Sequence, residues 1–304
     1  MRLVSYTSSA DSPAVGGPRA GVLVDGAVVD AATCAARAEL DPAVGWTRLR
    51  RIVADASAAD RRALQTASVE LASELGVPRE DVLLGPPIPD PGKILCVGLN
   101  YRDHVEESGG EPQEAADPVI FAKFATALRG DREDVVLPAA APSRIDYEGE
   151  LALVIGRACT RVEEAAALDH VAGYMPFNDV SARDLQVEHH QWTMAKGFDG
   201  SAPCGPALVT SDEVRDPQAL QLTTTLNGEV VQSTSTARMI HPIARVIAYV
   251  SSLITLLPGD VIATGTPAGV GHARDPQRYL SDGDRVAVRI DGIGELSNVV
   301  RGAR

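Results

Sequence analysis

Short strand-like runs divided by turn signals fill most of the chain after residue 92, and this pattern limits the fold more than any other feature. Turn dipeptides such as Asn227-Gly228 and Asp282-Gly283 separate these runs, and a helical pattern is sparse, chiefly over 240–256. The runs have the length and apolar content of strands: 93–98, 119–124, 151–155, 207–210, 220–226, 261–264 and 285–290. The pattern predicts a mainly β fold with some α instead of a regular βαβ repeat.

The first 85 residues have a different character and predict a small N-terminal α+β domain. Asp25-Gly26 lies between two apolar runs, as in a hairpin with a two-residue turn. Residues 58–75 have the pattern of a surface helix that ends at Gly76. A stiff proline-rich stretch follows. We therefore expect an N-terminal domain over 1–85, a linker over 86–92 and a catalytic domain over 93–304.

Composition excludes several classes of function. The chain has 304 residues, of which 45% are hydrophobic and 23% are charged, and no apolar run approaches the length of a membrane span. The formal net charge is −13 and no cluster of Lys and Arg is present, so a nucleic-acid surface is not expected. The first residues contain no apolar signal core. We expect a cytoplasmic enzyme that acts on a small molecule.

Three carboxylates predict a metal site. Glu148 and Glu150 are separated by one residue and run directly into the apolar stretch 151–155, while Asp179 follows in Phe177-Asn178-Asp179. Residues i and i+2 of a strand share a face, so both glutamates would project together from a buried strand, where uncompensated charge is costly. Three hard oxygen ligands suit Mg²⁺ or Mn²⁺. The alternative is a pair of ordinary glutamates that face solvent.

A histidine and a glutamate predict an acid–base pair. His104 and Glu107 lie three residues apart in a segment that is expected to begin a short helix near Asn100 or Tyr101, which would make them neighbours on its surface. A carboxylate beside an imidazole orients the ring and raises its basicity, as a general base that activates water requires. The alternative is an ordinary exposed histidine on a charged helix.

Two further segments carry candidate ligands for a substrate. Lys196 stands among small and apolar residues and could neutralise a substrate carboxylate or enolate. The glycine-rich stretch 263–271 lacks both the dinucleotide-binding order and a Walker lysine, but its tight turns could bring backbone amides and Thr266 close to a ligand. A purely structural loop is the alternative for each segment.

Five motifs in order resemble the fumarylacetoacetate hydrolase superfamily over residues 93 to 300. The strings that carry the resemblance are Gly98-Leu99-Asn100-Tyr101 with His104, Asp146-Tyr147-Glu148-Gly149-Glu150-Leu151, residues 178–186 (NDVSARDLQ), Ala195-Lys196-Gly197-Phe198-Asp199, and residues 258–267 (PGDVIATGTP). The resemblance implies a mixed β-sandwich roll, a homodimer and a variable N-terminal domain. The chain departs from many relatives at Gly200-Ser201-Ala202, so the sequence predicts no distal group for the substrate.

The resemblance also implies roles for individual residues. It implies Mg²⁺ or Mn²⁺ held by the three carboxylates, and it assigns water activation to His104 and Glu107 and a catalytic role to Lys196. It places the following residues at the substrate: Tyr101, Lys123, Arg183, Gln186 and Thr266.

These roles share one chemistry, the stabilisation of an enolate formed from a 2-oxo acid. The first expectation is a hydrolase that cleaves a carbon–carbon bond in a 2,4-dioxo acid of the acylpyruvate or fumarylpyruvate type. An isomerase of a 2-hydroxy-dienoate and a decarboxylase of the oxaloacetate type are the alternatives, because both use the same enolate. A protein without turnover, such as a metal-binding scaffold, is the alternative from another class. It is disfavoured because a scaffold has no need to keep costly charges together.

Overall fold

Two sheets form the frame of the protein. The computed structural model describes residues 1–8, 17–112, 116–140, 143–188 and 190–302. Its larger sheet consists of these strands: β1 (Arg2–Ser8), β2 (Arg19–Val24), β3 (Ala27–Asp30), β4 (Val77–Pro78), β5 (Val82–Gly85), β6 (Ile94–Gly98), β7 (Val119–Lys123), β11 (Gly149–Ile155), β12 (Val171–Asn178), β15 (Leu208–Thr210) and β18 (Val261–Ala263). The smaller sheet consists of β9 (Val135–Val136), β16 (Gln221–Leu226), β17 (Glu229–Ser235), β19 (Arg285–Ile290) and β20 (Gly294–Arg301). The mainly β fold with some α is confirmed.

The remaining elements are short ribbons and helices. β8 (Leu128–Arg129) pairs with β14 (Ala202–Pro203), and β10 (Ile145–Asp146) pairs with β13 (Ser181–Ala182). The α-helices are α1 (Ala31–Arg37), α2 (Leu49–Asp55), α3 (Ala58–Leu75), α4 (Arg102–Glu107), α5 (Trp192–Lys196) and α6 (Ile243–Leu253). Every strand-like run predicted above contains a strand, and α3 and α6 fall on the two predicted helical stretches. The strands β12, β17 and β20 were not predicted from the sequence.

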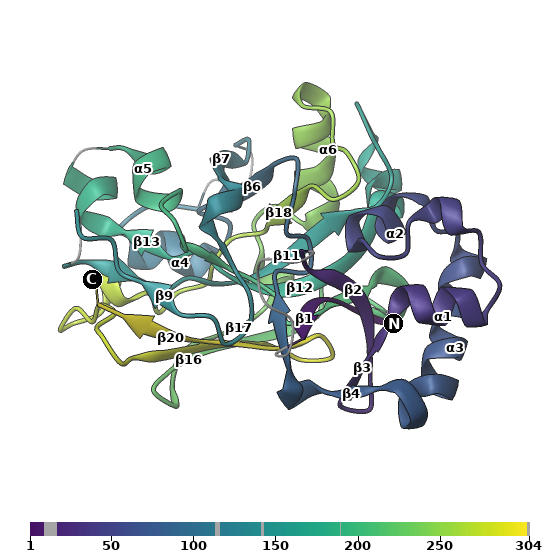
Figure 1. The fold of residues 1–304 in the computed structure, drawn as a ribbon. Helices are drawn as coiled ribbons and strands as arrows, with labels where there is room; N and C mark the ends of the chain where they lie inside the picture. Colours follow the sequence, from purple (N-terminus) through teal and green to yellow (C-terminus); the bar gives the residue numbers. More distant parts are fainter. Residues whose placement is uncertain (9–16, 113–115, 141–142, 189, 303–304) are drawn as a thin grey trace.

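The larger sheet runs without a break from the N-terminal segment into the rest of the chain. Its order is β4-β3-β2-β1-β15-β12-β11-β18-β6-β7, with β5 also paired to β1. Helices α1, α2 and α3 gather around β1 to β4 at one end of the molecule, on the right in Figure 1. The predicted hairpin is present, with both turn residues, Asp25 and Gly26, at positive φ. The predicted domain boundary near residue 85 therefore lies within one sheet and stays a prediction.

Strand β11 lies at the centre of the packing and is buried along its whole length. Because side chains alternate along a strand, it contributes to two hydrophobic clusters. Leu151 and Leu153 pack in a cluster with α6 and the smaller sheet, which includes Val246. Ala152 and Val154 pack in another cluster with the N-terminal strands and helices. The amino end of β11, where Glu148 and Glu150 lie, is thereby fixed from both faces.

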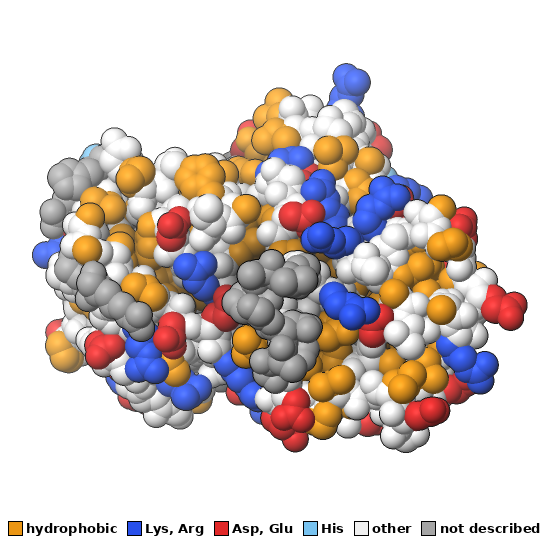
Figure 2. Space-filling model, viewed as in Figure 1, with side chains coloured by type: hydrophobic (Ala, Val, Ile, Leu, Met, Phe, Trp, Pro, Cys, Tyr) orange, Lys and Arg blue, Asp and Glu red, His pale blue; other side chains and the backbone are white. Residues whose placement is uncertain are grey.

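The surface gives no further guide to partners. None of the helices in the described part of the chain combines the length and apolar character needed to cross a bilayer. On the face in Figure 2, hydrophobic side chains form small patches that are divided by charged and polar groups. The homodimer that the resemblance implies stays a prediction.

The two sheets approach each other closely at Gly149. A Cβ atom added there would lie 1.9 Å from Thr224 Oγ1 in β16. Its backbone is also occupied, because the Gly149 amide donates to Gln232 Oε1 at 2.9 Å and its carbonyl accepts from Thr266 Oγ1 at 3.0 Å. A larger residue fits between the two glutamates only if the side chain of Thr224, and with it Gln232, shifts.

Substitution of Gly149 tests this close approach. We expect Gly149→Ala to lower the free energy of unfolding by roughly 1–3 kcal/mol, the usual cost of overpacking a core, as measured by urea denaturation. Thr224→Ala in the same chain removes the nearest atom and should restore part of the loss. Gly85→Ala, where the nearest atom to the added Cβ is 4.0 Å away, is the matched control and should change stability little. Equal stability of Gly149→Ala and the control would contradict the packing argument.

Candidate active site

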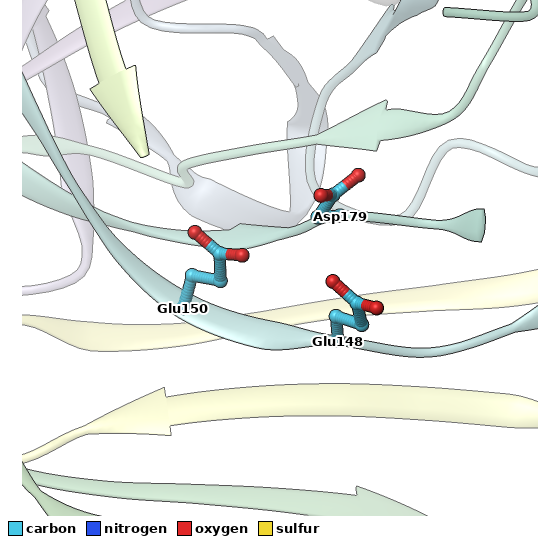
Figure 3. A group of neighbouring side chains, drawn as sticks. All are labelled: Glu148, Glu150 and Asp179. Atoms are coloured by element: carbon cyan, nitrogen blue, oxygen red, sulfur yellow. The ribbon is translucent and has the colours of Figure 1, made fainter. Parts of the chain in front are cut away.

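Three carboxylates converge at the junction of β11 and β12. Glu148 and Glu150 flank Gly149 on the same face of the chain, and Asp179 directly follows β12, which pairs antiparallel with β11. One oxygen from each carboxylate can be chosen so that all lie within 4.8 Å of one another. Figure 3 shows the three side chains as neighbours, with Asp179 above the two glutamates. All three are buried, so the alternative of solvent-facing glutamates is wrong.

Buried cations compensate two of the carboxylates. Lys196 Nζ lies 2.7 Å from Glu148 Oε2 and 2.9 Å from Asp179 Oδ2. Lys123 Nζ lies 2.6 Å from Asp179 Oδ1, and Arg183 Nη2 lies 2.6 Å from Glu148 Oε1. Burial alone would raise the pKa of Glu148, but Lys196 and Arg183 outweigh it and hold that pKa well below its usual range. Burial likewise opposes the charge of Lys196, yet Asp179 and Glu148 raise its pKa above the ordinary value.

Glu150 differs from its two neighbours. Its Oε2 accepts a hydrogen bond from the Gly265 amide at 2.7 Å, and no Lys or Arg of the described residues forms an ion pair with it. Burial, followed by the charges of Asp179 and Glu148, raises its pKa well above the usual range. A buried carboxylate beside two others is stable as an anion only if further positive charge reaches it. The donor set therefore fits a hard divalent cation such as Mg²⁺ or Mn²⁺.

The predicted histidine–glutamate pair forms on α4. His104 Nδ1 lies 2.7 Å from Glu107 Oε1, and Glu107 Oε2 accepts from the Gly269 amide at 2.8 Å. The histidine is only 8% exposed, so the alternative of an ordinary exposed histidine is wrong. Since Glu107 is held by both the helix and the glycine-rich loop, it fixes the orientation of the ring and leaves Nε2 available to a ligand.

Two adjoining cavities lead to the carboxylates. The inner cavity, of about 30 Å³, is lined by Val97, Gly98, Leu99, His104, Phe121, Glu148, Arg183, Gln186, Trp192, Lys196 and Thr266. The outer cavity, of about 490 Å³, is lined by Leu99, His104, Glu107, Ser108, Arg183, Gln186, Val187, His190, Trp192, Val270, His272 and Ala273. His104 lines both, so a ligand that reaches the carboxylates passes its ring.

Two residues predicted at the substrate, Tyr101 and Lys123, do not line either cavity. Tyr101 is fully buried in the hydrophobic cluster beneath α6 and is absent from the walls of both cavities. Lys123 is buried behind Asp179, where its ammonium also contacts the Val180, Lys196 and Ser201 carbonyl oxygens. Lys123 thus supports a carboxylate. Neither residue lines the two cavities, and their roles at the substrate stay a prediction.

The other predicted substrate residues line the inner cavity but also serve the structure. Arg183 donates to Asp146 Oδ2 at 2.9 Å and to Gln186 Oε1 at 2.8 Å, in addition to its contact with Glu148. These contacts engage the Arg183 guanidinium on several sides. Because Oε1 of Gln186 is taken by Arg183, the NH₂ group of Gln186 is the part of that side chain that can bind a ligand. The Thr266 hydroxyl donates to the Gly149 carbonyl and ties the glycine-rich loop to β11.

Sequence reasoning missed two buried residues that hold the site together. Asp146 accepts from Arg183 and from the Gly271 and His272 amides, at 2.7 Å and 3.0 Å for the two amides. Its position two residues before Glu148 was an available signal. Gln232 in β17 connects the Gly149 amide with the Thr266 hydroxyl, at 2.9 Å and 2.8 Å. Nothing in the sequence marks Gln232, because its partners belong to distant segments.

The fit of the carboxylates to a divalent cation predicts a metal-dependent stability. We expect Mg²⁺ or Mn²⁺ to raise the melting temperature, with a stabilisation of about 2.7 kcal/mol at a concentration 100 times Kd. Glu150→Gln should lose most of this effect while the metal-free protein melts no lower than wild type, because the site disfavours the charged form of Glu150 and a glutamine keeps an acceptor for the Gly265 amide. Glu295→Gln, an exposed acidic residue, is the control. A cation effect that persists in Glu150→Gln would contradict the assignment.

Relatives of known name match most of the chain. The protein Rv2993c of Mycobacterium tuberculosis is 50% identical over 223 residues, 73% of this chain and 80% of that protein. The oxaloacetate tautomerase YisK of Bacillus subtilis is 43% identical over 221 residues, 72% of this chain and 73% of that protein. These alignments cover more than two thirds of each partner.

Solved structures extend the similarity to the whole chain. A protein from Mycobacterium smegmatis described as an HpcE protein has a TM-score of 0.81 at 36% identity, and the alignment covers 100% of both chains. Maleylpyruvate hydrolase from Sphingobium has a TM-score of 0.77 at 31% identity, again over 100% of both chains. The family model for the fumarylacetoacetate (FAA) hydrolase C-terminal region matches residues 93–301. With the acidic cluster, the acid–base pair and the buried lysine in one place, the chain belongs to the fumarylacetoacetate hydrolase family of enzymes.

Proposed function

We propose that this enzyme catalyses the keto–enol tautomerisation of oxaloacetate or a closely related 2-oxo acid. The observation that carries the proposal is the position of His104, which lines the inner cavity between the carboxylates and the outer cavity and is oriented by Glu107. The preference for tautomerisation rests on the relatives, since YisK is named an oxaloacetate tautomerase at 43% identity. The sequence alone put hydrolysis first and treated proton transfer as an alternative.

The reactive end of the substrate belongs at the carboxylates. A divalent cation held by Glu148, Glu150 and Asp179 supplies Lewis-acid polarisation of the 2-keto oxygen when it is bound. Lys196 keeps its proton, because Asp179 and Glu148 raise its pKa against the effect of burial. Its ammonium therefore offers a fixed positive charge to the oxygen on which the enolate charge develops, in a site from which most water is excluded.

His104 is placed to move the proton. Conversion of enol to keto form removes the proton from the oxygen on C2 and adds a proton to C3, while every carbon–carbon bond remains intact. An imidazole with Nδ1 held by Glu107 can accept or donate this proton through Nε2. The Gly269 amide that holds Glu107 keeps this pair in place. Arg183 and Gln186 shape the cavity wall beside the reacting atoms.

Hydrolysis of a 2,4-dioxo acid is the second candidate. The same His104–Glu107 pair could activate water, and a structural relative over the whole chain is named maleylpyruvate hydrolase. Decarboxylation of an oxaloacetate-like acid uses the same enolate and remains the third candidate.

Mg²⁺ or Mn²⁺ as cofactor, a homodimer and a cytoplasmic location complete the proposal. An inactive scaffold is disfavoured, because the buried charges that catalysis requires are all retained.

The role of His104 can be tested by substitution. We expect His104→Gln to reduce tautomerisation by roughly 10²- to 10⁴-fold, the usual contribution of a general acid–base group, as followed by the decay of the enol absorbance of oxaloacetate. Glu107→Gln should produce a smaller loss in the same direction. His170 lines neither the inner nor the outer cavity, so His170→Gln is the control and should retain wild-type activity. Full activity of His104→Gln would refute the assigned role.

Product analysis separates the candidate reactions. We expect NMR of oxaloacetate in D₂O with Mg²⁺ or Mn²⁺ to show accelerated enol–keto conversion and deuterium at C3, without release of carbon dioxide, and to show no acceleration with EDTA. Acetylpyruvate and fumarylpyruvate should remain uncleaved. Metal-dependent release of a carboxylic acid and pyruvate from either would establish the hydrolase instead, and carbon dioxide from oxaloacetate would establish the decarboxylase.

A further inference from the structure

The outer cavity is larger than the proposed reaction of a four-carbon acid requires. Its volume of about 490 Å³ falls in the range that proteins use for ligands of considerable size. It shares His104, Arg183 and Gln186 with the inner cavity. A 2-oxo acid whose reactive end lies at the carboxylates therefore extends its distal end into this space.

The wall of the outer cavity is apolar on one side and offers a specific donor on the other. Leu99, Val187, Trp192 and Val270 provide the apolar surface. Arg183 is the cation of the wall, but Asp146, Glu148 and Gln186 already engage it. The polar side chains Ser108, Gln186 and His190 also line the wall, and of these Ser108 and His190 are exposed. His272 is partly buried and is held by hydrogen bonds at both its amide and its ring, so it is the best-fixed polar side chain for a distal polar group.

The hydrogen-bond partners of His272 favour one tautomer of its ring. Its Nδ1 lies 2.7 Å from the Tyr279 hydroxyl, which is not part of the cavity wall. The Gln277 amide donates to the His272 carbonyl at 2.9 Å, which places its NH₂ group 3.4 Å from the same Nδ1. An amide NH₂ only donates, so Nδ1 is an acceptor and the neutral ring carries its proton on Nε2.

The surroundings also keep the ring neutral and in place. Burial, followed by the charges of Arg183 and, in part, Arg144, lowers the pKa of His272, and Asp146 only partly opposes them. The His272 amide donates to Asp146 Oδ2 at 3.0 Å, which connects the residue to the network around Arg183. Since Nδ1 is occupied by Tyr279, Nε2–H is the donor that His272 presents to a ligand in the outer cavity.

We propose that His272 is a specificity-determining residue whose Nε2–H binds an oxygen at the distal end of a 2-oxo acid longer than oxaloacetate. Tyr279 is the positioning residue that selects the tautomer. The inference rests on the proposed function only in placing the reactive end of the substrate at the carboxylates. A donor in a mostly apolar wall discriminates strongly, because an analogue without the distal oxygen leaves the donor unpaired.

Calorimetry with two acids of equal length tests the proposal independently of turnover. The probes are 2-oxoadipate, which has a distal carboxylate, and 2-oxohexanoate, which lacks it, each added to the protein with Mn²⁺. We expect wild type to bind 2-oxoadipate at least tenfold more tightly. His272→Phe should lose about tenfold or more on 2-oxoadipate and little on 2-oxohexanoate. Equal losses on both acids, no loss on either, or no binding of either acid by wild type would overturn the proposal.

Two further measurements make the result specific. In ¹⁵N-histidine NMR, His272 should show an unprotonated Nδ1 and a protonated Nε2, and Tyr279→Phe should weaken this preference and reduce the affinity for 2-oxoadipate. A protonated Nδ1 in wild type would contradict the assignment. Oxalate probes the reactive end alone and should bind equally to wild type and His272→Phe. If both acids bind as expected but no tautomerisation occurs, the proposed function fails while the role of His272 stands.

Discussion

The burial of three neighbouring carboxylates is the constraint on which the rest of the structure depends. Glu148, Glu150 and Asp179 would repel one another and lose their hydration if they were buried alone. Lys123 from β7 and Lys196 from α5 approach from separate parts of the chain to offset that cost. Because removal of one partner leaves a buried charge uncompensated, the positions of β7, α5 and β11 are coupled through electrostatics as well as through packing.

This arrangement gives the binding site two parts: a rigid inner cavity at the carboxylates and an outer cavity whose wall tolerates changes of side chain more easily. The inner cavity is lined by residues of β6 and β7, such as Val97 and Phe121, and by the ion-paired side chains of Glu148, Arg183 and Lys196. The wall of the outer cavity comes largely from α4, the first residue of α5 and the segments 183–190 and 270–273, where a change of side chain has fewer consequences for the core. Such a division accounts for relatives of one fold that are named tautomerase and hydrolase. In the proposed mechanism the reactive end of the cavity forms an enolate common to these reactions, and the remaining walls determine which substrate reaches it.

The sequence predicts the parts of the site whose signal is local. Glu148 and Glu150 share a strand face, and His104 and Glu107 share a helix face, so spacing alone brought each pair together. Contacts between segments that are far apart in the sequence could not be predicted from residue spacing. Gln232 became visible only when β17 was placed beside the glycine-rich loop. Tyr101 illustrates the opposite limit, because a match to a family motif does not reveal that the ring points into the hydrophobic cluster.

The fold was predictable to a similar degree. Alternating patterns and turn dipeptides identified most long strands, but the pairing of β1 with β15 joins residues about 200 positions apart and has no local signature. That pairing has a consequence for the shorter fragment that begins after the proline-rich stretch. Loss of β1 would turn β15 into an open edge with unpaired backbone groups and would expose the apolar surface that the N-terminal helices cover. Open edges of this kind can pair with strands from other molecules, so we expect a fragment without the N-terminal segment to self-associate more readily than the whole chain.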